Sequence, residues 1–251
     1  MIAALLGVIW WWLIPIRRDK AIENFKRCFP SLPVGPNLRR SVGEMALQFP
    51  ELALGARCTI DGIDAVRGGG LILGGHFGAW EILLVSLADA VPVTIFIREP
   101  SSPLAARLIR RLRSQARDLE LLTPSDSPRR AYRALEAGRV VMLVQDQRYN
   151  RGISTTFFGR PCKTAISFAA LAHFSGAPLF GVSQWRDGRQ HKARIEPLDW
   201  DVPDDRRDAI RVLTEKSQTF YEAKIRVRPH SWLWLHDRWR DGEESDPKRP
   251  R

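Results

Sequence analysis

The chain has 251 residues, 44% of them hydrophobic and 27% charged, with a formal net charge of +11. This length and composition favour one globular domain with a single core. The positive charge favours a polyanionic partner, either nucleic acid or an anionic bilayer. No zinc-finger spacing, RNP-like motif or basic recognition helix is found, which argues against nucleic acid. The three cysteines, Cys28, Cys58 and Cys162, have neither a pairing pattern nor a metal-ligand spacing, which indicates a reducing compartment.

The first segment, residues 2–16, contains no charged side chain and includes three consecutive tryptophans at 10–12. A helix of this length extends about 22 Å, less than the ~30 Å hydrocarbon core of a bilayer. We therefore expect a membrane anchor over residues 1–16, partly inserted or lying at the interface, with Arg17, Arg18 and Lys20 on the cytoplasmic side. The alternative is a first helix buried against the protein. The order of the charges argues against a cleaved signal peptide.

The rest of the chain alternates segments of helical period with short apolar segments typical of strands. In chain order we expect helices at 19–29 and 37–54, a strand at 71–73, a helix at 79–88, a strand at 93–97, helices at 104–119 and 128–137, a strand at 140–144, a helix at 164–174, strands at 179–184 and 192–195, and a helix at 204–226. Strands separated by helices predict a single α/β domain, residues 17–240, with a mostly parallel central sheet flanked by helices. The charged, proline-containing end, 241–251, is expected to be a disordered tail.

Polar or ionisable side chains follow three of the expected strands. His76 follows the strand at 71–73, Arg98 follows the next strand, and Asp146 with Gln147 follows the strand at 140–144. Reactive groups gather at the carboxyl ends of the strands in an open α/β sheet. The sequence therefore predicts that these residues share one crevice.

The segment 74–81, Gly-Gly-His-Phe-Gly-Ala-Trp-Glu, carries the strongest chemical signal in the chain. His76 and Glu81 are five positions apart, about 140° around a helix, so they can meet only at a strand-to-helix junction. A carboxylate on one ring nitrogen fixes the histidine tautomer, and the other nitrogen can then accept a proton. Gly75 and Gly78 permit close approach of a substrate or of another backbone segment. The HExxH pattern of zinc proteases is absent, and no metal site is predicted.

Five blocks occur in order along residues 17–240. They are R-R-x-x-A-x-x-N-F-x-x-C-F-P at 17–30, H-F-G-A-W-E at 76–81, Arg98 with P-L at 103–104 and Arg111 and Arg113, D-Q at 146–147 with F-F-G at 157–159 and Thr164, and P-H-S-W-L-W-L-H-D-R-W at 229–239. Together they resemble the late lipid A biosynthesis acyltransferases, the lauroyl and myristoyl transferases within the lysophospholipid acyltransferase superfamily. The acid at position 81 is Glu, and no Glu-Gly-Thr-Arg block follows it, which separates the chain from the glycerol-phosphate branch.

The resemblance implies a membrane-associated enzyme on the cytoplasmic side of the inner membrane. It would move a fatty acyl chain from acyl carrier protein or CoA thioester to a hydroxyl of a lipid A precursor, as a monomer and without a further cofactor. His76 would be the general base supported by Glu81, and Arg113 the arginine at the reacting centre. The substrate-binding residues would be Arg98, Arg111, Asp146, Gln147, Gly75 and Gly78.

Two other interpretations stay open from the sequence. The chain could acylate another glycolipid or a lysophospholipid from acyl-CoA, because relatives that act on mannosyl-inositol lipids share the HxxxxE segment. It could also be a non-catalytic basic module that binds membranes. The tryptophans at 232, 234 and 239 are expected to pack in the core, with a membrane-facing belt as the alternative.

Overall fold

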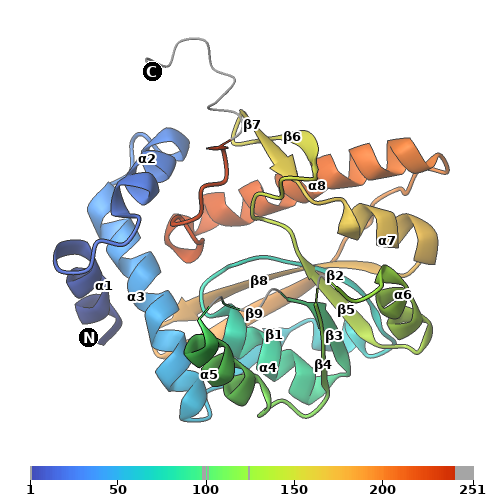
Figure 1. The fold of residues 1–251 in the computed structure, drawn as a ribbon, viewed down its shortest axis with the longest axis horizontal. Helices are drawn as coiled ribbons and strands as arrows, with labels where there is room; N and C mark the ends of the chain where they lie inside the picture. The colour runs from blue at the N-terminus through green and yellow to red at the C-terminus, as the bar shows by residue number, and fades with distance from the viewer. Residues whose placement is uncertain (1, 98–99, 101, 124, 241–251) are drawn as a thin grey trace.

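The computed structural model describes residues 2–97, 100, 102–123 and 125–240. A seven-stranded sheet lies at the centre with helices over both faces, and a separate two-stranded hairpin packs against α8 (Arg206–Val227) (Figure 1). This arrangement confirms the predicted single α/β domain. Arg98 and the tail at 241–251 lie outside the described residues.

The central sheet is parallel except for one pair of strands. Its strands follow one another across the sheet as β1 (Cys58–Asp61), β9 (Gln190–Pro197), β8 (Leu179–Asp187), β2 (Gly70–Gly74), β5 (Val140–Val144), β3 (Val93–Phe96) and β4 (Leu119–Leu122). Only β8 and β9 run antiparallel, because a tight turn joins them directly. The central pair, β2 and β5, is in register from Gly70 opposite Val140 to Gly74 opposite Val144. The carboxyl ends of these two strands are therefore neighbours.

The strands bury two separate cores because successive side chains point to opposite faces. Leu71 and Leu73 belong to one core, and Ile72 between them belongs to the other. The helices are α1 (Ile2–Trp12), α2 (Arg18–Cys28), α3 (Val34–Ala53), α4 (Trp80–Ala90), α5 (Pro103–Arg113), α6 (Pro128–Glu136), α7 (Ser167–Ser175) and α8 (Arg206–Val227), with 3-10 turns η1 (Ile63–Val66) and η2 (Pro229–Ser231). Helices α7 and α8 cover the first core, and α4 covers the second (Figure 1).

Three parts of the fold differ from the sequence prediction. Strands β1 and β4 were not expected, and the helix predicted over 104–119 ends at Arg113. Both strands are short edge strands that are only partly buried, so they lack the continuous apolar run of central strands. The third part is the hairpin of β6 (Ile153–Phe157) and β7 (Arg160–Thr164), whose turn residues both have positive φ. Helix α7 therefore begins at Ser167 instead of at Thr164.

Helix α1 packs against α3 through two glycines. A Cβ atom on Gly7 would lie 2.0 Å from the Arg39 carbonyl oxygen, and one on Gly43 would lie 1.9 Å from that of Ala3. Only hydrogen fits at these positions, so the two helices touch backbone to backbone. Among the described residues, no helix combines the length and apolarity needed to cross a bilayer.

The N-terminal segment nevertheless leaves much apolar surface uncovered. The exposed side chains are Ile2 at 63%, Leu5 at 59%, Val8 at 42%, Trp12 at 67%, Leu13 at 75%, Ile14 at 54% and Ile16 at 64%. Gly7 and Trp10 of α1 are buried. One face of α1 therefore packs on the protein and the other is exposed, and contact of this segment with a membrane stays a prediction.

Candidate active site

The register of β2 and β5 brings His76 and Asp146 together. Gly74 and Val144 are opposite each other, and His76 and Asp146 each follow two residues later. The Asp146 carboxylate is fully buried and accepts two hydrogen bonds from His76, 2.9 Å from the ring Nδ1 and 2.9 Å from the backbone nitrogen. Two strands that are far apart in sequence thus build one His–Asp pair.

The C-terminal part of the chain completes this pair. Trp232 donates its indole N–H to Asp146 Oδ2 at 2.8 Å, and its own carbonyl accepts from Ser41 Oγ at 2.8 Å. Tyr221 of α8 donates its hydroxyl to the Gly74 carbonyl at 2.7 Å and accepts from the Gln145 backbone nitrogen at 3.2 Å. The Tyr221 hydroxyl therefore forms hydrogen bonds at the carboxyl ends of both β2 and β5.

The His76 side chain is partly exposed. The side chain is 24% exposed, and the ring packs edge-on against Trp80 with centroids 5.0 Å apart. Since Asp146 occupies Nδ1 as an acceptor, Nδ1 carries the proton and Nε2 carries a lone pair. The Gln147 side-chain amide lies 3.2 Å from Nε2. Gln147 in turn is held by Arg238, which donates to its carbonyl at 3.0 Å.

The ionisation of Asp146 reflects its partners. Burial by itself raises the pKa of a carboxyl group, but the neighbouring His76 ring and the hydrogen bonds from His76 and Trp232 outweigh burial and lower the pKa of Asp146 to about 2. The carboxylate is therefore charged at neutral pH. It can hold the ring in the Nδ1–H form and stabilise positive charge on it.

Glu81 is not the partner of His76, and the expected contact between them is corrected. Both Glu81 oxygens accept from the Arg113 guanidinium, at 2.7 Å and 2.8 Å, in a buried bidentate ion pair. The Glu81 backbone nitrogen donates to Gln48 Oε1 at 3.1 Å. Glu81 thus joins α4 to α5 and α3, and Asp146 makes the contact with the ring that the spacing suggested for Glu81. A catalytic part for Glu81 or Arg113 stays a prediction.

The glycines of the loop serve its conformation. Gly78 has φ of +48°, and a Cβ there would lie 2.0 Å from Gln184 Oε1, while one on Gly75 would lie 2.6 Å from the Phe77 ring. The backbone N–H groups of residues 76–79 are each hydrogen bonded within the protein. They are therefore not free donors for a developing oxyanion.

A buried polar chain supports the loop from β8 and β9. Gln184 accepts from the Ala79 nitrogen at 2.6 Å, and its amide nitrogen lies 3.3 Å from His191 Nδ1. His191 Nε2 lies 2.9 Å from the Glu51 carboxylate. Burial, followed by the Arg186 guanidinium, lowers the pKa of His191, so the ring stays neutral and its Nδ1 accepts from Gln184. The orientation of the Gln184 amide is thereby fixed.

The predicted arginines take different positions. Arg113 turns inward with 11% of its side chain exposed, whereas Arg111 is exposed on the outer side of α5. Arg98 belongs to the residues that the structure does not describe. Of the predicted site residues, the structure therefore gathers His76, Asp146 and Gln147 at one point.

Four side chains that hold the site were missed by sequence reasoning. These side chains are Gln48, Gln184, Tyr221 and Trp232. Each forms its hydrogen bond with a residue 33 to 147 positions away along the chain, so no local sequence pattern indicates the contact. Trp232 lies in the C-terminal tryptophan block, and its burial together with that of Trp234 and Trp239 confirms core packing. The sequence signal for its hydrogen bond to Asp146 was the polar indole N–H, which needs an acceptor when buried.

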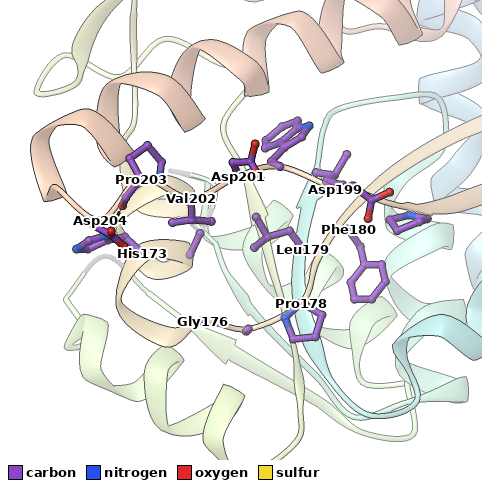
Figure 2. Close-up of a pocket in the computed structure, with 15 residues that line it drawn as sticks. His173, Gly176, Pro178, Leu179, Phe180, Asp199, Asp201, Val202, Pro203 and Asp204 are labelled. Atoms are coloured by element: carbon purple, nitrogen blue, oxygen red, sulfur yellow. Dashed lines mark hydrogen bonds between the residues drawn. The ribbon is translucent and has the colours of Figure 1, made fainter.

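A cavity of about 700 Å³ lies elsewhere, at the amino end of β8. Figure 2 shows it between His173 and Gly176 near the end of α7 and the facing segment 199–204. Because β2 and β8 run parallel, this cavity is at the opposite end of the sheet from His76.

Within residues 2–97, 100, 102–123 and 125–240, no group of three His, Cys, Asp or Glu side chains could hold a metal ion.

The chain is similar to known proteins described as acyltransferases. The family model described as bacterial lipid A biosynthesis acyltransferase matches residues 42–241. The phosphatidylinositol mannoside acyltransferase of Mycolicibacterium smegmatis is 28% identical over 195 residues, which are 75% of this chain and 62% of that protein. The chain thus spans less than two thirds of that relative. The crystal structure of the 1-acyl-sn-glycerophosphate acyltransferase PlsC from Thermotoga maritima covers 88% of this chain and 97% of that one, with 14% identity and a TM-score of 0.36, too low to support an argument.

The depressed pKa of Asp146 predicts how stability depends on acid. Its pKa is lower in the folded chain than in the unfolded chain, so its contribution is complete above the unfolded value of 3.8 and is lost as the pH falls toward about 2. The contribution is roughly 2 kcal/mol. Urea unfolding of the wild type and of Asp146→Asn between pH 5 and pH 3 measures it. We expect the variant to be less stable at pH 5 and the difference to shrink on acidification; a constant difference would contradict the assignment.

Proposed function

Because the chain belongs to the bacterial lipid A biosynthesis acyltransferase family, we propose that it transfers a fatty acyl group from a thioester to a glycolipid hydroxyl, with His76 as the general base. The observation that carries the proposal is the His76 ring, whose Nδ1 is held by buried Asp146 and whose side chain is 24% exposed. A histidine in this state is equipped to accept a proton from an alcohol.

The reaction follows from the two ring nitrogens. As the acceptor oxygen attacks the thioester carbonyl, its proton passes to His76 Nε2, and the hydroxyl displaces the Gln147 amide as the partner of that nitrogen. The Asp146 carboxylate stabilises the imidazolium. When the tetrahedral intermediate collapses, the carbon–sulfur bond breaks and the proton moves from Nε2 to the leaving thiolate. Base catalysis of this kind contributes about 10²–10⁴-fold to the rate.

The choice between Asp146 and Glu81 as the carboxylate behind the base can be tested with matched variants. We expect His76→Ala to abolish acyl transfer and Asp146→Asn to lower kcat about 10²–10⁴-fold, since the ring loses its fixed tautomer. Glu81→Gln keeps the size of the side chain and leaves the His76–Asp146 contact in place, so its loss of kcat should be smaller. Turnover of a soluble acyl thioester by folded protein, checked by circular dichroism, is the measurement.

An inactive Glu81→Gln with a nearly normal Asp146→Asn, both folded, would reverse the assignment. Normal turnover by folded His76→Ala would remove the base altogether. A fully folded wild type that binds membranes and cleaves no thioester would favour the non-catalytic membrane-binding alternative.

The acceptor we propose first is a lipid A precursor, and the donor an acyl carrier protein or CoA thioester. The family description supports lipid A. A second candidate is a phosphatidylinositol mannoside, because the curated relative from Mycolicibacterium smegmatis is named for that acceptor. Purified protein should be supplied with each donor and each acceptor in turn, and the products measured by mass spectrometry. We expect one acceptor to be acylated at least tenfold faster; equal, slow transfer to both would contradict a dedicated glycolipid acyltransferase.

The open face of α1 supports a location at the cytoplasmic face of the inner membrane. We propose that Leu5 and Trp12, which are 59% and 67% exposed, enter the bilayer interface. Leu5→Ser/Trp12→Ser should lower the fraction of protein that sediments with phospholipid vesicles several-fold. Leu54→Ser/Val227→Ser is the matched control, because these residues are 88% and 68% exposed, directly after α3 and at the end of α8. An equal loss in both double variants would mean that α1 has no special contact with lipid.

A further inference from the structure

Helix α5 presents an unusual outer face. Leu104, Arg107, Leu108 and Arg111 follow the spacing i, i+3, i+4, i+7, and all four side chains are exposed. The two leucines are 78% and 51% exposed. We call these four residues the α5 stripe. Large apolar side chains at this spacing normally face a core, so the stripe is amphipathic surface without a covering element among the described residues.

The inner face of the same helix packs against the rest of the protein. Ala106 and Leu112 are buried, and Ser102 caps the helix by accepting from the Ala105 nitrogen at 3.4 Å. At the last residue of α5, Arg113 grips Glu81 in the bidentate ion pair described above. Glu81 lies in the first turn of α4, directly after the loop that carries His76. This ion pair therefore connects α5 directly to the helix that follows the candidate base.

The two exposed arginines of the stripe are available for anions. Neither Arg107 nor Arg111 pairs with a carboxylate among the residues that the structure describes. Guanidinium groups suit phosphates because they donate in a planar fork. Exposed leucines together with arginines on one helix are typical of helices that lie in a membrane interface.

We propose that the α5 stripe is a docking surface for an anionic lipid bilayer, with Leu104 and Leu108 in the interface and Arg107 and Arg111 on lipid phosphates. The proposal extends the proposed function, because it supplies a contact close to the candidate base and distinct from α1. The exposed leucines favour a bilayer over an acidic protein, for which arginines alone would suffice. The ion pair of Arg113 with Glu81 then fixes the position of the His76 loop relative to the lipid surface.

Vesicle sedimentation of the full chain tests the proposal. Vesicles of phosphatidylcholine with phosphatidylglycerol are compared with phosphatidylcholine alone, at low and high salt. Arg107→Glu/Arg111→Glu should weaken binding to the anionic vesicles about 25-fold or more, since each arginine near such a surface contributes roughly a fivefold factor. Leu104→Ser/Leu108→Ser, which leaves the charge unchanged, should weaken binding to both kinds of vesicle several-fold.

Helix α6 supplies the matched control. Arg129→Glu/Arg133→Glu changes the net charge by the same amount on a helix that exposes arginines, and neither residue pairs with a carboxylate among the described residues. Binding should fall much less than in the α5 charge variant. An equal fall in both would show attraction by net charge alone and overturn the proposal, as would unchanged binding of the leucine variant.

Two further readouts separate this proposal from the proposed reaction. Cleavage of a soluble thioester without vesicles should be unchanged in Leu104→Ser/Leu108→Ser, while acylation of vesicle-embedded glycolipid falls. If the wild type cleaves no thioester but the α5 variants still lose vesicle binding, the reaction fails and the docking surface stands. If the α5 variants lose binding of an acidic carrier protein and keep vesicle binding, the surface belongs to that protein and the bilayer proposal fails.

Discussion

The buried carboxylate of Asp146 is the point on which the site depends. It has no access to water, and it is stabilised by hydrogen bonds from the His76 ring, the His76 backbone and the Trp232 indole. The acceptor and its donors come from three parts of the chain: the aspartate follows β5, the histidine follows β2, and the tryptophan lies in the C-terminal segment. A buried charge with fewer donors would be strongly destabilising. The same bonds that hold the charge in place also fix the tautomer of the ring, so stability and chemistry share one set of contacts.

The two acidic side chains near the candidate base contact different partners. Asp146 faces the ring, whereas Glu81 is occupied by Arg113 and ties the start of α4 to the end of α5. Because this ion pair is buried and bidentate, removing one partner would leave an uncompensated charge. Its position between the loop that carries His76 and α5 connects the candidate site with the surface that we propose for lipid.

The loop itself is held by polar groups on all sides. Gln184 accepts from Ala79, Gln48 accepts from Glu81, and Ser231 accepts from Gly78 through its carbonyl. These hydrogen bonds hold the loop that carries His76 in one conformation. Because the backbone donors are used within the protein, other groups would have to stabilise an oxyanion. The neutral state of His191 behind Gln184 maintains this arrangement, because its Nδ1 must accept a hydrogen bond.

The sequence by itself determined the alternation of helices and strands, the central strands, and the placement of His76, Asp146 and Gln147 at strand ends. These features are local, since a buried parallel strand is a continuous apolar run and polar residues at its end stand out against it. Edge strands such as β4 and the hairpin of β6 and β7 carry weaker patterns and were missed. Only the tertiary structure decided which carboxylate meets the histidine. A spacing of five residues suggested Glu81, but the register of β2 with β5 placed Asp146 against the ring, and strand pairing is a long-range contact that spacing along the chain does not encode.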